Sequence, residues 1–163
     1  NNWILITFDN KKYWLRKDDV LKTIDLNSEV QSYNKPIILI KNKVLFKLPS
    51  YGSNTSLSLD PQIVQSVRKY KNWYSIQFKS SEYWVSNSSV ITNFNPEKIN
   101  KTYKLLTDKS GYSIPYSSSQ VFTTVPKNAL VKGEEIWKDW VLIKYNENRY
   151  WLKIDNTLVE NEV

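Results

Sequence analysis

The stretch KDWVLIKYNENRYWLKIDNT, residues 138–157, decides the fold expected for this chain, because two similar stretches precede it. They are NNWILITFDNKKYWLRKDDV, residues 1–20, and KNWYSIQFKSSEYWVSNSSV, residues 71–90. Their first tryptophans, Trp3, Trp73 and Trp140, are separated by 70 and then 67 residues. In each copy a Tyr-Trp pair places a second tryptophan eleven positions after the first. Three equal spacings indicate an internal repeat.

The segments upstream of these stretches match only twice. Phe46-Lys-Leu-Pro49 corresponds to Tyr112-Ser-Ile-Pro115, and a second proline follows each, at Pro61 and Pro126. We therefore expect two complete repeats, a middle repeat in residues 30–96 and a C-terminal repeat in residues 97–163. Residues 1–29 are expected to be the trailing half of a first repeat. The other half is expected upstream in a longer protein, since the chain begins without methionine or a leader.

Each copy has the alternation of a β-hairpin. In WILITF the side chains of Ile4, Ile6 and Phe8 fall on one face, and Trp3 falls on the other. The same alternation places the pairs Tyr74 and Ile76, and Val141 and Ile143, on core faces. A polar stretch, DNKK, KSSE or NENR, then leads into a short strand that holds the Tyr-Trp pair. If the turn has an even number of residues, both tryptophans of a copy project from the same, non-core face.

Short strands at close spacing in repeats of about 65 residues predict an all-β chain of small antiparallel barrels. Helical periodicity is poor throughout. The one stretch expected to hold a helical turn is SLSLDPQIVQSV around Pro61.

The order aromatic-x-x-Pro, variable loop, Trp-x-x-Ile, polar turn and Tyr-Trp-Val/Leu resembles the bacterial Src-homology-3-like (SH3-like) repeats. It is most similar to the GW-type and cell-wall-targeting modules of autolysins and surface adhesins. The matching positions are Trp73-Tyr74-Ser75-Ile76 with Tyr83-Trp84-Val85, and Trp140-Val141-Leu142-Ile143 with Tyr150-Trp151-Leu152. The resemblance implies tandem SH3-like barrels and noncatalytic binding to Gram-positive wall polymers. Tyrosine stands where that family commonly has glycine before the second tryptophan, so no particular ligand pocket is carried over.

Composition argues against catalysis. The 163 residues include no cysteine and no histidine, which removes thiol chemistry, disulfides, histidine-based triads and most zinc sites. The adjacent acidic residues Asp18-Asp19 and Glu134-Glu135 would point to opposite faces of a strand and form no catalytic pair. No apolar run approaches the roughly 20 residues that cross a bilayer. We expect no enzyme, no cofactor and no metal.

The net charge of +7 is concentrated in the middle repeat, where eight basic and two acidic residues give +6. A basic surface favours an anionic partner such as teichoic acid, a glycosaminoglycan or nucleic acid, or serves solubility alone. Nucleic acid is not favoured, because no base-reading motif is present. The candidate cationic ligand residues are Lys41, Lys43 and Lys47, expected on one strand face, and Arg68, Lys69 and Lys71 before Trp73.

Tryptophans are the candidate stacking residues. Indole rings can stack on sugar rings or attract the ammonium of a D-alanyl ester on teichoic acid. The alternative is that they cover the barrel or pack one repeat against the next. The candidates are Trp3, Trp14, Trp73, Trp84, Trp140 and Trp151, with Tyr51 and Tyr116 as additional loop aromatics.

These observations predict an extracellular, cell-wall-associated module that anchors a secreted Gram-positive protein. Its expected ligand is teichoic or lipoteichoic acid, or peptidoglycan. Linked weak sites would suit anchoring, because they raise effective concentration. The alternative is an adhesin or surface-layer assembly module that binds host glycosaminoglycan or protein partners.

Overall fold

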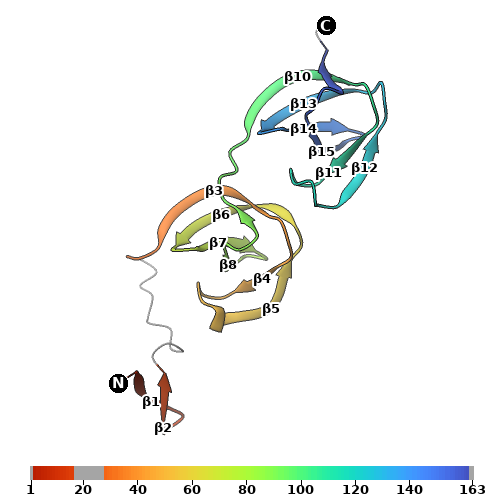
Figure 1. Ribbon diagram of the computed structural model, residues 1–163. Coiled ribbons are helices and arrows are strands. Elements are labelled where there is room, and N and C mark those ends of the chain that lie inside the picture. The colour runs from red at the N-terminus through yellow and green to blue at the C-terminus, as the bar shows by residue number, and fades with distance from the viewer. Residues whose placement is uncertain (1, 17–27, 162–163) are drawn as a thin grey trace. The chain divides into compact units, whose positions relative to one another are not determined.

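A computed structural model describes residues 2–16 and 28–161 (Figure 1). All its regular elements in these ranges are β-strands, apart from one short 3₁₀ turn, η1 (Tyr51–Ser53). The all-β prediction is therefore confirmed. Within the same ranges, no helix has the length and apolarity needed to span a membrane.

Three hairpins carry the repeated tryptophans. They are β1 (Trp3–Phe8) with β2 (Lys11–Arg16), β7 (Trp73–Phe78) with β8 (Ser81–Ser86), and β14 (Trp140–Tyr145) with β15 (Asn148–Lys153). Each turn has two residues with positive φ: Asp9-Asn10, Lys79-Ser80 and Asn146-Glu147. Two left-handed residues make the type I′ geometry that matches strand twist. The even turn that the sequence argument required is present in all three copies.

The register places both tryptophans of a copy on one face. Leu5 lies opposite Trp14 and Trp3 opposite Arg16. In the same way Ser75 lies opposite Trp84, and Leu142 opposite Trp151. Because residues two apart share a face, the two indoles of each copy share one as well. The predicted pairing of the tryptophans is confirmed.

The hairpins β7–β8 and β14–β15 each belong to a seven-stranded antiparallel sheet. One sheet has the order β5-β4-β8-β7-β6-β3-β9 and the other β12-β11-β15-β14-β13-β10-β16. Strands at equivalent positions of the two repeats therefore stand in the same order in the two sheets. The remaining strands are β3 (Gln31–Leu39), β4 (Lys43–Phe46), β5 (Asn54–Leu59), β6 (Gln62–Tyr70), β9 (Val90–Ile91), β10 (Glu97–Leu105), β11 (Lys109–Tyr112), β12 (Val121–Val125), β13 (Leu130–Trp137) and β16 (Leu158–Glu160).

Two expectations about the fold need correction. None of the three sheets among the described residues closes into a barrel; each has two edge strands, and β1–β2 is a separate two-stranded sheet. The helical turn considered around Pro61 is also absent, because β5 ends at Leu59 and β6 starts at Gln62. The β-branched residues that follow Pro61 favour the extended backbone seen there.

By contact density the described chain divides into two compact units. One contains the described residues up to Asn34 together with Val44–Ser58 and Ser66–Ser86, and the other contains Lys35–Lys43, Leu59–Gln65 and the residues from Asn87 onward. These units do not follow the boundaries at 29/30 and 96/97. The division into repeats as domains therefore stays a prediction.

The predicted core faces are buried in both seven-stranded sheets. Tyr74 and Ile76 are buried, and Val141 and Ile143 are completely so. The last two belong to a cluster with Tyr103, Leu105, Val125, Val131, Leu152 and Leu158. In the N-terminal hairpin the equivalent residues Ile4 and Ile6 are only half-buried. Alternation thus identified the core face, and burial followed where a complete sheet supplied partners.

Candidate ligand-binding clefts

An open cleft of about 580 Å³ lies at the turn that joins β6 to β7. One wall comes from the end of β6 and the turn, and the other from the segment that enters β3. We call it the Tyr70 cleft; its lining residues are Glu29, Gln31, Lys69, Tyr70, Lys71 and Asn72. All of them belong to the first compact unit.

A second cleft, of about 350 Å³, lies at the turn that joins β13 to β14. Its other wall is the segment that enters β10. We call it the Trp137 cleft; its lining residues are Asn93, Asn95, Glu97, Ile136, Trp137 and Lys138. All of them belong to the second compact unit.

The two clefts occupy equivalent positions in their sheets. Tyr70-Lys71 and Trp137-Lys138 are related by the same 67-residue offset that separates Trp73 from Trp140. In both places an aromatic residue ends a strand and a lysine begins the two-residue turn. A recurring cleft that keeps an aromatic-lysine pair is the feature with the clearest potential for ligand binding.

The lysines of the turns lie over the neighbouring rings. The Nζ atom of Lys71 is 5.3 Å from the ring centroid of Tyr70, and that of Lys138 is 4.5 Å from the Trp137 ring. These distances allow cation–π attraction, which holds each ammonium beside an aromatic face. Lys69 adds a second cation to the Tyr70 cleft, with its Nζ atom 5.5 Å from the ring of Tyr74.

Both turn lysines adopt a backbone conformation that disfavours their residue type. The φ angle is 48° at Lys71 and 52° at Lys138. In this left-handed region a Cβ atom is crowded, and glycine or asparagine is usual. Lys79 has the same φ of 48° although it lines neither cleft, so positive φ at a lysine is a feature of the tight turns of this chain. Lys71 and Lys138 are distinguished by their place in a cleft.

In the two complete repeats the candidate tryptophans do not present a free ring face for stacking. Trp84 and Trp151 are only 1% and 2% exposed, and Trp73 and Trp140 are also buried. Aromatic residues cover this face: Phe46 and Tyr51 lie 5.1 and 4.8 Å from Trp73, and Tyr112 lies 5.4 Å from Trp140, between ring centroids. The alternative of structural packing is the one observed.

In the N-terminal hairpin the same positions are exposed, at 51% for Trp3 and 64% for Trp14. These two remain stacking candidates by exposure. Tyr51 is also exposed, although its ring contacts Phe46 and Trp73. Tyr116 is half-buried and packs against the cluster that contains Trp140 and Trp151.

The expectation that Lys41, Lys43 and Lys47 share one strand face is wrong. Lys43 begins β4, whereas Lys41 and Lys47 lie outside that strand. Lys41 and Lys47 are exposed, but Lys43 is buried and its Nζ atom donates a hydrogen bond of 2.6 Å to the carbonyl of Ser88. Burial lowers the pKa of the Lys43 ammonium. This side chain is part of the fold and is removed from the ligand candidates.

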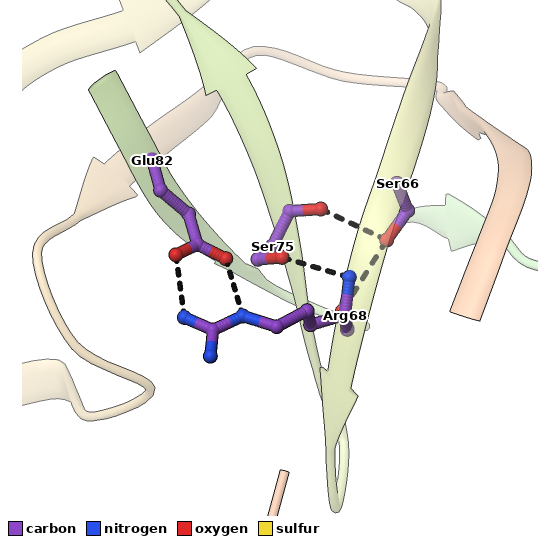
Figure 2. Close-up of polar contacts among 4 residues, drawn as sticks. All are labelled: Ser66, Arg68, Ser75 and Glu82. Atoms are coloured by element: carbon purple, nitrogen blue, oxygen red, sulfur yellow. Dashed lines mark hydrogen bonds and ion pairs between the residues drawn. The ribbon is translucent and has the colours of Figure 1, made fainter. Parts of the chain in front are cut away.

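Arg68 is likewise engaged within the sheet (Figure 2). Its Nε and Nη2 atoms donate hydrogen bonds of 2.8 and 2.5 Å to the two carboxylate oxygens of Glu82. The guanidinium carbon also lies 5.7 Å from the Trp84 ring centroid. The hydrogen bond from Arg68, assisted by one with Ser75, lowers the pKa of Glu82 although its partial burial opposes this. Arg68 therefore stabilises the sheet, and Lys69 and Lys71 remain as predicted cations in a cleft.

Two buried serines complete this polar cluster at an irregularity in the β6–β7 pairing between Ser66 and Lys69 (Figure 2). The backbone N–H of Arg68 donates to Ser75 Oγ at 2.9 Å, and Ser66 Oγ donates to the Ser75 carbonyl at 2.9 Å. A bulge removes ladder hydrogen bonds, and these side chains replace them. The cluster is structural rather than part of a cleft.

Sequence reasoning missed five residues on which the clefts depend: Tyr70, Trp137, Lys138, Glu29 and Glu97. For the first three the signal was available in the alignment of the repeats. An aromatic-lysine pair stands three positions before Trp73 and again three positions before Trp140.

The described residues contain no group of acidic side chains that could hold a metal ion. Glu134 and Glu135 lie on β13, where Glu134 pairs with Arg149. Asp18 and Asp19 lie outside the described residues.

No family model matches the chain, and no curated protein matches it. Among solved structures, it is similar to NlpC2 and NlpC1 from Trichomonas vaginalis, each at 17% identity and a TM-score of 0.33. The matches cover 78% of this chain and 49% of NlpC2, and 86% of this chain and 50% of NlpC1. This chain thus spans about half the length of either protein.

Proposed function

We propose that this chain is a noncatalytic module of tandem SH3-like repeats that anchors a secreted protein to Gram-positive wall polymer. The Tyr70 and Trp137 clefts are its binding sites. Teichoic acid, lipoteichoic acid and peptidoglycan are the candidate polymers. The observation that carries the proposal is the recurrence of an open cleft with an aromatic-lysine pair at equivalent places in the two repeats.

The chemistry of the clefts suits a polyol or sugar chain that carries anions. Tyr70 is half-buried and offers part of its ring to the C–H groups of such a chain. Trp137 is only 6% exposed and instead holds the Lys138 ammonium beside its ring. In both clefts the turn lysine offers a partner for phosphate or carboxylate. Amide side chains at Asn72, Asn93 and Asn95 supply both hydrogen-bond donors and acceptors. Each cleft is open, as binding along a continuous polymer requires.

Repetition suits this role. A single shallow site binds a polymer weakly, but a second site on the same chain binds at a high effective concentration. The surplus of positive charge in the middle repeat assists encounter with an anionic wall. The electrostatic contribution predicts binding that weakens with salt.

The decisive experiment is sedimentation with purified Gram-positive cell walls, before and after removal of teichoic acids. We expect the chain to bind untreated walls. Loss of binding to stripped walls identifies teichoic acid, and retention identifies peptidoglycan. Absence of binding to both preparations would overturn the proposal.

A matched set of variants assigns the binding to the clefts. Combined Lys71→Ala and Lys138→Ala substitutions should weaken wall binding by about tenfold or more, since a charge-assisted hydrogen bond contributes about 1.5–3 kcal/mol. Lys79→Ala is the control. Lys79 has the same φ of 48° as Lys71, and its Nζ atom also lies 5.3 Å from the preceding aromatic ring, but it lines neither cleft. Equal losses in control and cleft variants would exclude the clefts as the sites.

The second candidate is an adhesin or surface-layer assembly module that binds host glycosaminoglycan or protein. The exposed apolar residues of the N-terminal hairpin, Trp3, Phe8 and Trp14, favour it, because such residues are common in protein interfaces. Retention on heparin without wall binding would support the adhesin. Self-assembly into sheets would support the surface layer.

A further inference from the structure

We infer that each cleft selects a polymer unit that carries an ammonium group beside its anion. This inference rests on the proposed function and narrows its ligand. The ligand class is a phosphodiester polymer esterified with an amino acid whose amine is free, as in D-alanylated teichoic acid. A purely anionic polymer is the less favoured ligand.

The first observation is that each cleft contains one carboxylate. It is Glu29 in the Tyr70 cleft and Glu97 in the Trp137 cleft. They do not stand at equivalent positions, because Glu97 corresponds to Gln31 and Glu29 corresponds to Asn95. The carboxylate is therefore present in both clefts although its position in the sequence has changed. Its presence is not a simple consequence of the repeat.

The extended backbone explains how a carboxylate at either of two sequence positions can line the same side of a cleft. Residues two apart in an extended segment point the same way. Asn93, Asn95 and Glu97 line the Trp137 cleft, while the intervening Phe94 is buried with its ring centroid 5.3 Å from that of Trp137. A carboxylate at either of two alternate positions on this segment faces the cleft.

The opposite wall carries the cations, Lys69 and Lys71 in one cleft and Lys138 in the other. A phosphate that approaches these ammonium groups also approaches the carboxylate across the cleft. The like charges repel and offset part of the attraction. An ammonium on the same ligand unit changes that repulsion into attraction, so both walls contribute.

The two clefts should differ in how strongly they prefer the esterified polymer. The Tyr70 cleft has two lysines and one glutamate, and the Trp137 cleft has one of each. Because the Tyr70 cleft has one more lysine than glutamate, it should bind an unesterified phosphate better than the Trp137 cleft does. We therefore expect the Trp137 cleft to show the stronger preference for the esterified polymer.

The test compares teichoic acid that retains its D-alanyl esters with the same preparation after mild alkaline removal of the esters. Binding of both to the full chain is measured by titration calorimetry at a fixed ionic strength. We expect the esterified form to bind about threefold to tenfold more tightly. Equal affinity for the two forms would overturn the inference and leave wall binding intact. Binding of neither form would count against the inference and, together with a failure to sediment with cell walls, against the proposed function.

Variants locate the preference. Glu29→Gln with Glu97→Gln should tighten binding of the de-esterified polymer and weaken binding of the esterified one. Lys71→Ala with Lys138→Ala should weaken both. Glu147→Gln is the control, because Glu147 is a highly exposed glutamate in the β14–β15 turn and lines neither cleft. A preference that survives the double glutamate substitution, or that Glu147→Gln removes equally, would overturn the assignment.

Discussion

The guanidinium of Arg68 donates two hydrogen bonds to the carboxylate of Glu82, and the C-terminal repeat has an ion pair of reversed polarity between the corresponding strands. There Arg149 on β15 donates to Glu134 on β13, at 2.5 Å from Nε and 3.2 Å from Nη2. By the 67-residue offset Glu82 on β8 corresponds to Arg149, whereas Arg68 on β6 corresponds to Glu135, so Arg149 pairs with the glutamate one position before the equivalent one. In each repeat the ion pair links two strands across the strand between them: β6 and β8 across β7, and β13 and β15 across β14.

Reversal of the middle pair is therefore a direct test of its role. Arg68→Glu alone places two carboxylates together in a partly buried site, and we expect it to destabilise the protein by about 3 kcal/mol. Adding Glu82→Arg restores an ion pair of reversed polarity between β6 and β8 and should recover most of that loss. Urea unfolding of the two single variants and the double variant measures the coupling. Additive losses would show that the two side chains do not interact.

The buried indoles give a second prediction. Trp84→Ala removes a side chain that is 1% exposed and packs with Phe46 and Trp73, so it should cost about 3–5 kcal/mol. Trp14→Ala, at the equivalent position of the N-terminal hairpin, removes a side chain that is 64% exposed and should cost less than about 1 kcal/mol. Thermal or urea unfolding measures both. Similar losses for the two would contradict the difference in burial.

The left-handed turn lysines separate stability from binding. Lys71→Gly and Lys138→Gly relieve the crowding of a Cβ atom at positive φ, and each should stabilise the protein by roughly 0.5–1 kcal/mol. Both should also weaken polymer binding, because the cleft loses its ammonium. Lys79→Gly should stabilise to a similar extent and leave binding unchanged. Denaturant midpoints and cell-wall sedimentation give the two measurements.

The pair formed by Lys109 and Asp155 predicts a response to acid. The buried Lys109 ammonium lies 2.7 Å from the Asp155 carboxylate, and its hydrogen bond, with a second from Thr157, lowers the pKa of Asp155 from 3.8 to about 2. Because the folded-state pKa is the lower one, ionised Asp155 stabilises the fold above about pH 4, and this contribution is lost as the pH falls toward about 2.

Asp155→Asn tests this dependence. The variant should be less stable than the original chain at pH 7, and the difference between them should shrink as the pH falls from 4 toward 2. Urea midpoints at several pH values provide the measurement. A difference that stays constant down to pH 2 would show that this carboxylate does not contribute through its charge.

The sequence predicted the hairpins well because their causes are local. Alternation fixed which residues share a face, and the eleven-residue spacing with a two-residue turn placed Trp73 beside Trp84 and Trp140 beside Trp151. It predicted the environment of that face poorly. Tyr112 and the segment from Phe46 to Tyr51 cover the indoles, and they come from strands and loops more than 20 residues away in the chain.

The candidate site was likewise predictable where its causes are local and unpredictable where they depend on distant strands. The basic residues before Trp73 were predicted, and Lys69 and Lys71 do line a cleft. Arg68, their neighbour, does not, because its partner Glu82 lies on β8 and its bond with that carboxylate is visible only in the folded sheet. Lys43 was removed from the ligand candidates for a similar reason, because its ammonium donates a hydrogen bond to the carbonyl of Ser88, which lies 45 residues away in the chain.

By itself, then, the sequence determined the repeat, the strand alternation and the pairing of the tryptophans, since these follow from spacing and from backbone periodicity. Only the tertiary structure decided which of those side chains face solvent, because exposure depends on what distant strands bring against them. The clefts are the clearest case: Gln31 and Tyr70 are separated by most of a repeat and meet only when the sheet forms.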